Sequence, residues 1–363
     1  MGCIELGVYL HFPWCRKRCP YCDFAVEVGD PPHELYLEAV LAELAARGDA
    51  FGGELQSIYF GGGTPSLWRQ DCLAKAIAAV TARYGAPREV TIEANPTDCT
   101  DDNLAAWRDA GITRISIGVQ SFEPQTLVTL GRDHRFGDGR AALDRVLAAG
   151  FEVSADFILG VPGSDTIFEI DTRPDHLSIY ELTIEERTAF GQRVRDGRLV
   201  PLPDDAVAEL YTQTHERLAR EGYEHYEISS YARPGHRAVH NSLYWRGVPY
   251  LGLGVGAASL ALDAHGAGTR QTNPRRASEY LAAPGTPAEQ QAISEREMAI
   301  DRAWLGLRVV DGIAEDALAP ARGVADWLVS ESLAERRGDR ICPTLRGFLL
   351  ADRIAARVVE AWE

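Results

Sequence analysis

Residues 7–22 read GVYLHFPWCRKRCPYC, an apolar run followed at once by three cysteines. These cysteines, Cys15, Cys19 and Cys22, have the spacing Cys-x3-Cys-x2-Cys, and the aromatic Tyr21 precedes the last one. Three thiolates on one loop can hold three irons of a 4Fe-4S cube and leave the fourth iron without a protein ligand. An iron that the protein leaves open can take part in chemistry, so this stretch predicts a reactive metal centre.

Other uses of the three cysteines fit the sequence less well. Structural zinc takes four ligands, usually as two pairs, and the chain has no second pair of closely spaced cysteines. His11 could be a fourth ligand, but it precedes the loop and is expected in a strand. A disulfide scaffold is disfavoured in a chain of 363 residues whose remaining cysteines are scattered: Cys3, Cys72, Cys99 and Cys342.

Composition narrows the class of protein. The chain has 53 acidic and 37 basic residues and a formal net charge of −16, which argues against nucleic-acid binding because such surfaces are basic. No run approaches the ~18 apolar residues of a membrane span, and the N-terminus shows no secretory signal. We therefore expect a soluble cytoplasmic protein in a reducing compartment, without a transmembrane segment.

The first two thirds of the chain alternate between short apolar runs and amphipathic stretches. Strands are expected over Leu6–His11, Ser57–Phe60, Val90–Ala94, Arg114–Val119, Glu152–Leu159 and His176–Leu182. Helices are expected over His33–Arg47, Gln70–Tyr84, Asp101–Ala110, Gly139–Ala149 and Asp205–Glu221. Three helices run into Gly111, Gly150 and Gly222, the usual left-handed residue after a helix. These six strand–helix units predict an α/β fold with a parallel sheet. Because a standard closed barrel needs eight such units, a partial (β/α)6 barrel is expected.

The predicted crossover between the fifth and sixth strands is unusually short. Residues 164–175 alone connect the two strands, whereas a parallel crossover usually needs a dozen or more residues including its helix. We therefore expect a flexible or absent helix in this segment.

The chain is expected to divide into a core, a connecting region and a terminal module. The core covers residues 1–235, and strands and loops with the motif HNSLYW are expected over residues 236–288. Residues 284–287, PGTP, predict a turn or linker. A small α-rich, winged-helix-like module is expected at residues 289–363, with helices over Ser294–Val309, Glu315–Ala319, Gly323–Glu331 and Leu345–Trp362.

Polar residues follow the predicted strands at one end. The cysteine loop follows the first strand and GGGTP, residues 61–65, the second, while Glu93, Gln120 and Asp156 lie in or at the end of the next three. In parallel α/β folds functional groups collect at the carboxyl ends of strands, so these residues are expected around one ligand. Each also has a structural interpretation: glycines make tight turns, and a buried Glu93 could pair with an arginine.

The cysteine motif resembles that of radical S-adenosylmethionine enzymes. Other motifs narrow the resemblance to the oxygen-independent coproporphyrinogen III oxidase family: YFGGGTPS at 59–66, EANP at 93–96, IGVQSF at 117–122, LGRDH at 130–134 and HNSLYW at 240–245. The resemblance implies a radical S-adenosylmethionine barrel with a 4Fe-4S cluster on Cys15, Cys19 and Cys22. It also implies S-adenosylmethionine contacts from Tyr9, Gly62, Gly63, Thr64, Glu93, Gln120, Arg132 and Asp156. In that superfamily an electron from the cluster splits the sulfonium of the bound cofactor.

Two departures from the decarboxylating enzymes favour another branch of the family. Those enzymes resemble Cys-x3-Cys-x2-Cys-x-Cys and have a long N-terminal arm, whereas here Phe24 replaces a fourth cysteine and 14 residues precede Cys15. Both differences point to the HemW-type heme chaperones. That branch implies heme binding, an electron donor, and delivery of heme to acceptor hemoproteins of the respiratory chain.

The heme-associated motif of that branch corresponds to His240, Tyr244 and Trp245. An imidazole can ligate heme iron and aromatic rings can cover a porphyrin face. On chemistry alone, a histidine beside aromatic core residues is the simpler interpretation, and the resemblance favours heme. Two other functions stay open: oxidative decarboxylation of coproporphyrinogen III, and radical chemistry on an unrelated substrate. Whether the protein is an enzyme stays open, and the sequence is compatible with peripheral membrane association.

Overall fold

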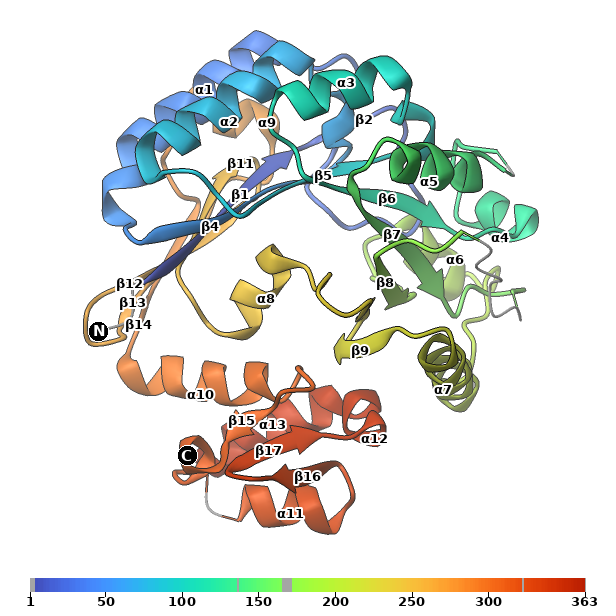
Figure 1. Cartoon of the computed structure of the whole chain (residues 1–363), viewed down its shortest axis with the longest axis vertical. Helices are drawn as coiled ribbons and strands as arrows, with labels where there is room; N and C mark the ends of the chain where they lie inside the picture. The colour runs from blue at the N-terminus through green and yellow to red at the C-terminus, as the bar shows by residue number, and fades with distance from the viewer. Residues whose placement is uncertain (1–3, 136, 165–171, 322, 363) are drawn as a thin grey trace.

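The computed structural model describes residues 4–135, 137–164, 172–321 and 323–362 of the chain (Figure 1). Its largest feature is a curved sheet with the strand order β14-β13-β12-β11-β1-β4-β5-β6-β7-β8-β10-β9. Successive parallel strands at its centre are β1 (Glu5–Phe12), β4 (Glu54–Gly62), β5 (Glu89–Ala94), β6 (Arg114–Gln120), β7 (Glu152–Leu159) and β8 (His176–Glu181). This arrangement confirms the predicted α/β fold with a partial barrel.

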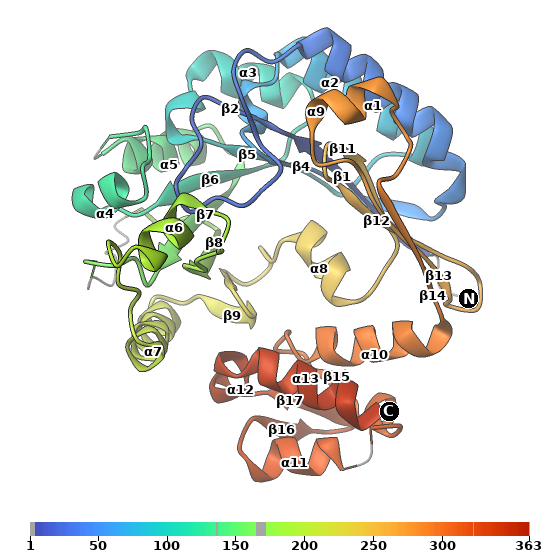
Figure 2. The same ribbon diagram turned by 180° about the vertical axis from the view of Figure 1, so that it is seen from behind.

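Helices cover the outer face of this sheet, as Figures 1 and 2 show from opposite sides. They are α1 (His33–Arg47), α2 (Gln70–Tyr84), α3 (Asp101–Asp109) and α5 (Asp138–Ala148). Apolar side chains of these helices and of the strands form the main core. The predicted helices agree with these bounds within one residue. Gly111, Gly150 and Gly222 have the positive φ expected after a helix, 92°, 78° and 86°.

Both edges of the sheet extend beyond the six central strands. One edge adds β11 (Tyr250–Gly254), parallel to β1, and then the antiparallel strands β12 (Ala258–Leu262), β13 (Gly268–Thr272) and β14 (Glu289–Ile293). The other edge adds the antiparallel strands β10 (Ser230–Ala232) and β9 (Glu224–Glu227). The sequence indicates these strands only loosely, because they are short and several are polar.

Further elements connect the units of the barrel. They are β2 (Trp14–Cys15), β3 (Glu27–Val28), α4 (Pro124–Thr129), α6 (Ala189–Arg195) and α7 (Asp204–Arg220). The short crossover predicted at residues 164–175 includes residues 165–171, so that prediction lies outside the described residues.

Helix α8 (Val239–Trp245) lies on the inner side of the curved sheet, against β1 and β4 (Figures 1 and 2). It carries the motif HNSLYW, so the expectation of strands and loops over residues 236–288 is wrong at this helix and at α9 (Ala277–Ala282). The two oxygens of the Glu89 carboxylate accept the backbone N–H groups of Val239 and His240, each at 3.2 Å. A residue of β5 thus accepts hydrogen bonds from the backbone N–H groups in the first turn of α8. No local sequence pattern reveals this contact.

The C-terminal segment forms a small mixed module with its own core. Its helices are α10 (Glu295–Gly306), the 3-10 turn Glu315–Leu318, α11 (Val324–Ser330), α12 (Leu345–Leu349) and α13 (Ala351–Trp362). Its three-stranded sheet has the order β15 (Ile313–Ala314), β17 (Arg340–Pro343), β16 (Ala334–Arg337). The single helix predicted over Leu345–Trp362 is wrong, because the backbone leaves the helical region at Leu350 (φ −115°, ψ 25°).

Backbone hydrogen bonds join this module to the edge of the barrel. The N–H of Ile228 donates to the carbonyl of Arg308 (3.0 Å), and the N–H of Val310 donates to the carbonyl of Tyr226 (2.9 Å). The predicted division of the chain into three parts stays a prediction, and β14 shows residues 289–293 as part of the large sheet. Within the described ranges, no helix combines the length and apolar character needed to cross a membrane.

Candidate functional site

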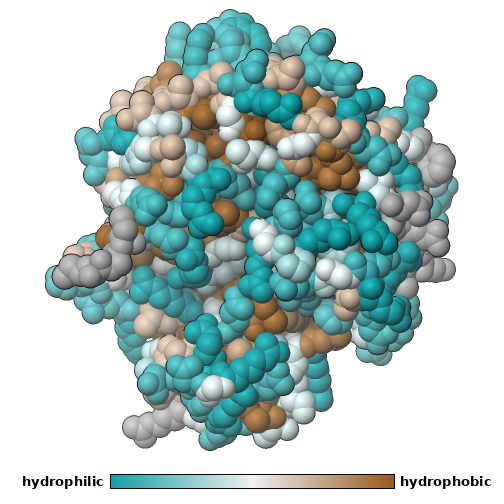
Figure 3. All heavy atoms as spheres, viewed as in Figure 1, coloured by the Kyte–Doolittle hydropathy of each residue, from teal (hydrophilic) through white to brown (hydrophobic). Residues whose placement is uncertain are grey.

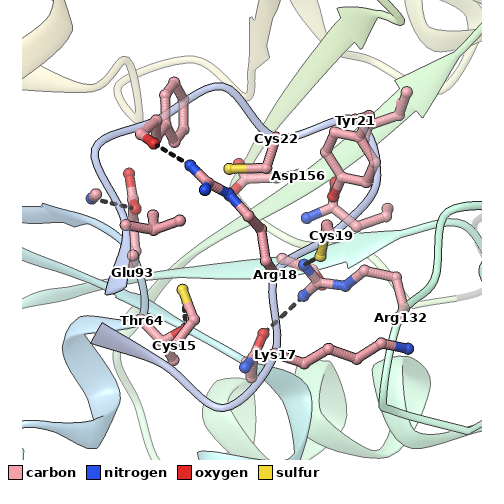
Figure 4. A pocket seen from close by; sticks show the side chains of 18 of the residues that line it. Cys15, Lys17, Arg18, Cys19, Tyr21, Cys22, Thr64, Glu93, Arg132 and Asp156 are labelled. Atoms are coloured by element: carbon pink, nitrogen blue, oxygen red, sulfur yellow. Dashed lines mark hydrogen bonds between the residues drawn. The ribbon is translucent and has the colours of Figure 1, made fainter. Parts of the chain in front are cut away.

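One pocket lies at the carboxyl ends of the central strands and has a volume of about 340 Å³. Cys15, Cys19 and Cys22 line it together with every predicted cofactor-contact residue except Tyr9. Those lining residues are Gly62, Gly63, Thr64, Glu93, Gln120, Arg132 and Asp156. Figure 4 shows Thr64, Glu93, Arg132 and Asp156 around the three cysteines. The structure thus brings residues from five strands, β4 to β8, and the cysteine loop into one concave site.

The cysteine loop is fixed to the barrel at several points. Strand β2 pairs with β3 and closes the loop at its base. Arg16 forms an ion pair with Asp98 at 2.7 Å, and the carbonyl of Pro20 accepts the backbone N–H of Phe190 at 2.9 Å. The ring of Tyr21 packs near Phe190, with 6.2 Å between the centroids. The aromatic residue before the last cysteine therefore helps to hold the loop in place.

Two of the three thiols accept hydrogen bonds from neighbouring side chains. Thr64 Oγ1 donates to Cys15 Sγ at 3.4 Å, and Arg132 Nη1 donates to Cys19 Sγ at 3.7 Å. Burial raises the pKa of Cys15 and of Cys22, and cysteines lose their protons when they ligate a metal. Three soft sulfur ligands on one loop, with N–H and O–H donors beside them, fit an iron–sulfur cluster.

The structural-zinc alternative would need a fourth ligand, and His11 does not supply it. In the described part of the chain, no group of three or more His, Cys, Asp or Glu side chains is placed to hold one metal ion. A zinc ion needs its ligands about 2.0–2.3 Å away, whereas cysteines that ligate a cube bind separate irons. His11 lies in β1 as predicted, and its ring nitrogens bond with Tyr9 Oη (3.0 Å) and the carbonyl of Ala25 (2.9 Å). Burial lowers its pKa to about 4, so it is a neutral core residue.

Glu93 is one of two buried carboxyls in the pocket. Its Oε1 accepts from Tyr59 Oη at 2.8 Å, and its Oε2 accepts from the N–H of Gly62 at 3.1 Å. Burial, and then the charge of Asp156, raise its pKa to about 7. Glu93 forms no ion pair with any described arginine, so the structure does not support the interpretation that it pairs with a structural arginine. The carboxyl remains available to a cationic or hydroxyl-bearing ligand.

Asp156 is the second buried carboxyl. Both of its oxygens lie 3.0 Å from Ser116 Oγ. Burial raises its pKa to about 6, and hydrogen bonds from Ser178 and Ser116 oppose this rise. A positively charged ligand between Glu93 and Asp156 would favour the ionised form of both groups.

Arg132 joins the cysteine loop to the strand ends. Its Nη2 donates to Asn95 Oδ1 at 2.6 Å and to the carbonyl of Gly118 at 3.2 Å. Its Nε is buried and finds no hydrogen-bond partner among the described residues. At the end of β6, Gln120 has a φ of 64°. For a residue other than glycine this conformation costs about 1 kcal/mol or more and often marks a functional site.

The glycines at the end of β4 allow two strand ends to approach closely. Gly62 has a φ of 109°, and a Cβ there would lie 2.5 Å from the ring of His11. A Cβ at Gly63 would lie 2.7 Å from the backbone of Pro13. Packing therefore explains why these two positions are glycine. The N–H of Gly62 donates to Glu93.

Tyr9 lies beside the pocket lining rather than within it. Its ring lies 6.1 Å from that of Tyr59 and 6.3 Å from that of His240. Tyr59, which the sequence does not single out, lines the pocket instead. Tyr9 is thus the predicted cofactor-contact residue that the structure separates from the others.

The predicted heme motif lies inside the barrel on α8. The side chain of His240 is 2% exposed, and its ring stacks on Tyr59 with 4.9 Å between the centroids. Its Nδ1 bonds with Ser57 Oγ at 2.8 Å and its Nε2 with Tyr244 Oη at 2.9 Å. Burial lowers its pKa to about 3. Because both nitrogens are engaged, His240 offers no free lone pair to heme iron in this structure. Trp245, the last residue of α8, is half-buried.

Sequence reasoning misses several residues that line the pocket. They include Tyr59, Ser116, Tyr180 and the cations Lys17 and Arg18. Ser116, Gly118 and Gln120 occupy alternate positions of β6, and all three line the pocket. Since alternate residues of a strand share a face, counting back from Gln120 could have found Ser116. No comparable signal marks Tyr180, which lies on the sixth parallel strand.

Comparisons with known proteins agree with this geometry. Residues 9–166 match the family model of the radical SAM superfamily. The chain is 37% identical to the heme chaperone HemW of Synechocystis sp., over 94% of this chain and 84% of the relative. It is 36% identical to the heme chaperone HemW of Mycobacterium tuberculosis, over 96% and 93% of the two chains. It is 38% identical to the heme chaperone HemW of Escherichia coli, over 76% and 75%.

A solved structure extends the comparison to the fold. The coproporphyrinogen III oxidase HemN of Escherichia coli, described as a radical SAM enzyme, superposes with a TM-score of 0.79. The alignment covers 98% of this chain and 90% of HemN at 20% identity, so this likeness shows the shared fold alone. With relatives this similar over most of their length, the chain belongs to the HemW heme chaperone family of the radical SAM superfamily.

Proposed function

We propose that the protein binds heme and delivers it to acceptor proteins, and that its pocket holds a 4Fe-4S cluster with S-adenosylmethionine. One observation carries the proposal: three cysteines on one loop share a pocket with two buried carboxyls, in a chain whose relatives are named heme chaperones. Cys15, Cys19 and Cys22 would hold the cluster. When bound there, the cluster supplies one-electron chemistry at an iron that no protein ligand covers.

The remaining pocket residues would bind and orient the S-adenosylmethionine. Its sulfonium and ammonium groups are positive, and Glu93 and Asp156 supply the negative charge that compensates them. The buried Nε of Arg132 has no partner among the described residues, so it could donate a hydrogen bond to a carboxylate or hydroxyl oxygen of the ligand. Arg132 also keeps Cys19 in position through its bond to the sulfur.

The cluster assignment is tested by the metal content of cysteine variants. Anaerobically reconstituted protein is expected to carry iron and sulfide, and replacement of Cys15, Cys19 and Cys22 by alanine is expected to remove both. The matched control is Cys342→Ala, a buried cysteine in the C-terminal module, which should leave the iron content unchanged. Full iron content in the triple variant would contradict the assignment.

Heme binding is tested by titration with hemin, followed by the Soret band. The wild-type protein is expected to show saturable binding. The His240→Ala variant is expected to bind hemin with similar affinity, because His240 is buried with both ring nitrogens bonded. If the folded variant lost the Soret shift, His240 would be the ligand, and α8 would have to leave the barrel for heme to reach it.

The decarboxylating alternative has its own test. Anaerobic incubation with coproporphyrinogen III, S-adenosylmethionine and a reductant is expected to yield no protoporphyrinogen. Accumulation of that product would favour the oxidase function over the chaperone function.

A further inference from the structure

A hollow of about 700 Å³ lies beside the cysteine loop, and we call it the basic hollow. Five cations line it: Lys17, Arg18, Arg187, Arg193 and Arg275. Asp23 is the one acidic residue among the described residues that line it. The chain as a whole has a net charge of −16, so a concentration of positive charge at this place is opposite to the general character of the molecule.

The positive charge of the basic hollow is largely uncompensated. Lys17, Arg18 and Arg193 form no ion pair with any residue that the structure describes. Arg187 and Arg275 share Asp23, at 2.7 and 4.0 Å. Arg18 donates to the carbonyl of Phe24 at 3.3 Å, and the guanidinium of Arg193 lies 5.5 Å from the centroid of the Phe190 ring, so neither contact neutralises the positive charge. Positive groups without an anionic partner around one concavity attract an anionic protein and increase its association rate.

The basic hollow also adjoins the predicted redox centre. Cys19 and Cys22 line it from the loop, so two of the three cluster ligands face both this hollow and the cofactor pocket. Lys17 and Arg18 extend from the same loop (Figure 4). Val128 lines the hollow with its side chain 71% exposed. Charged groups around an exposed apolar side chain are typical of a protein interface rather than of a small-anion site.

We propose that the basic hollow is the docking site of the electron donor, a small acidic protein that carries a flavin or iron–sulfur group near its surface. This inference rests on the proposed function, because it assumes a cluster on Cys15, Cys19 and Cys22. One electron passes from the reduced carrier to the oxidised cluster, so the carrier is oxidised and the cluster reduced by one electron, and no bond forms or breaks. Complementary charge and a small contact area suit such a transient encounter.

Two neighbouring arginines of α6 provide a matched test. Arg193 lines the basic hollow, whereas Arg195 does not and instead donates to the carbonyl of Glu186. Arg193→Glu and Arg195→Glu change the net charge equally. The dissociation constant of flavodoxin, an acidic flavin protein used as the probe, is measured at low salt with the cluster-loaded protein. Arg193→Glu is expected to weaken binding about tenfold and to reduce its salt dependence, and Arg195→Glu to change it by less than about twofold.

A second measurement separates docking from the redox properties of the cluster. Reduction of the cluster by flavodoxin is expected to slow in Arg193→Glu, while reduction by photoreduced deazaflavin, a small uncharged reductant, stays at the wild-type rate. Equal weakening by both substitutions, or no saturable binding to the wild type, would overturn the proposal. A loss of hemin affinity or of RNA affinity in Arg193→Glu, with flavodoxin binding intact, would assign the basic hollow to another anion and also overturn it.

Failure of the proposed function gives a different result. In that case the wild-type protein would contain no iron and sulfide after reconstitution, irrespective of its affinity for flavodoxin. Iron content is therefore measured first, on every variant.

Discussion

At the residue scale, Glu93 and Asp156 explain why the pocket favours a cationic ligand. Each is buried, and burial is the main reason that their pKa values rise to about 7 and about 6. Without a ligand the protein has to ionise two carboxyls in one small volume at neutral pH, which costs free energy. A bound cation removes that cost, so the free energy of ligand binding includes relief of an unfavourable state of the protein.

The raised pKa of Glu93 predicts a specific pH dependence of stability. The folded state holds the proton of the Glu93 carboxyl more tightly than the unfolded state, in which the pKa of this carboxyl has its ordinary value of about 4.5. The contribution of the protonated Glu93 carboxyl to the free energy of unfolding is therefore fully present below about pH 4.5, and it is lost as the pH rises through about 7. As the pH rises from 5 to 7, the unfolding free energy of Glu93→Gln is expected to increase by roughly 2 kcal/mol relative to that of the wild type.

Denaturant unfolding of protein prepared without S-adenosylmethionine checks this prediction, at several pH values for wild type and Glu93→Gln. Titrating groups that do not interact with Glu93 are common to both proteins and cancel in the difference, whereas Asp156, whose charge acts on Glu93, also contributes to it. A difference in unfolding free energy that is constant from pH 5 to pH 7 would contradict it. The same measurement in the presence of S-adenosylmethionine should reverse the ranking, because the ligand stabilises the wild-type carboxylate.

Residue spacing in the sequence predicts some residues of the candidate site and misses the environment of others, and the reasons are physical. The thiols of Cys15, Cys19 and Cys22 share a pocket because one short loop carries them all. Glu93 follows from its place at the end of a strand. His240 shows the limit: its sequence context does not reveal that Ser57 and Tyr244 occupy both ring nitrogens. Contacts between residues far apart in the chain depend on the assembled fold.

At the scale of elements, α8 depends on a buried ion pair. Glu89 accepts the first N–H groups of α8 and also pairs with Arg114 at 2.8 Å. Arg114 is 2% exposed, so it needs carboxylate partners to remain charged. The pair therefore couples the position of α8, and of His240 on it, to two central strands of the sheet.

Removal of Glu89 is expected to destabilise the protein strongly. Glu89→Ala leaves Arg114 without its buried partner and α8 without its acceptors, so we expect a loss of about 3–5 kcal/mol in unfolding free energy. Glu152 pairs with the same arginine, but its side chain is 41% exposed, so Glu152→Ala should cost about 1 kcal/mol or less. Chemical denaturation of both variants checks the difference, and equal losses would show that burial does not determine the effect.

Periodicity predicts the elements that pack on one another locally. The helices from His33 to Ala148 alternate with apolar strands, and their bounds agree closely with the sequence pattern. The pattern fails at α8, whose first turn is satisfied by Glu89 from another element, and at Leu350, where one amphipathic stretch is broken into two helices. Strand β13, with the sequence GTRQT, lacks an apolar face and is specified by its neighbours in the sheet, β12 and β14.

At the scale of the whole molecule, the chain carries a negative net charge, whereas the residues that line the basic hollow are mostly positive. The face shown in Figure 3 is mostly hydrophilic, with hydrophobic side chains in scattered groups. A net charge of −16 repels other acidic proteins at long range. An acidic carrier would therefore be attracted only where the local charge is reversed, and the basic hollow would orient it toward Cys19 and Cys22. Physiological salt shortens this attraction to about 8 Å, which suits a brief and specific encounter.

The C-terminal module is expected to fold without the barrel. Its core is a separate cluster that includes Leu328, Ile341 and Val358, and Ser294 begins it with a capping box that satisfies the first turn of α10. Residues 294–363 expressed alone are therefore expected to unfold in one cooperative thermal transition, measured by circular dichroism. A small module has only a few kcal/mol of stability.

A pair of leucine substitutions then tests whether this core is what stabilises the fragment. Leu328 is 0% exposed, so Leu328→Ala should cost about 2–5 kcal/mol and abolish the transition. Leu349 is 37% exposed, so Leu349→Ala should leave the transition nearly unchanged. A broad transition in the unsubstituted fragment would mean that the module depends on the barrel, through contacts such as the bond from Ile228 to Arg308. The two parts of the chain would then form one cooperative unit, and a change at the edge of the barrel would reach the module directly.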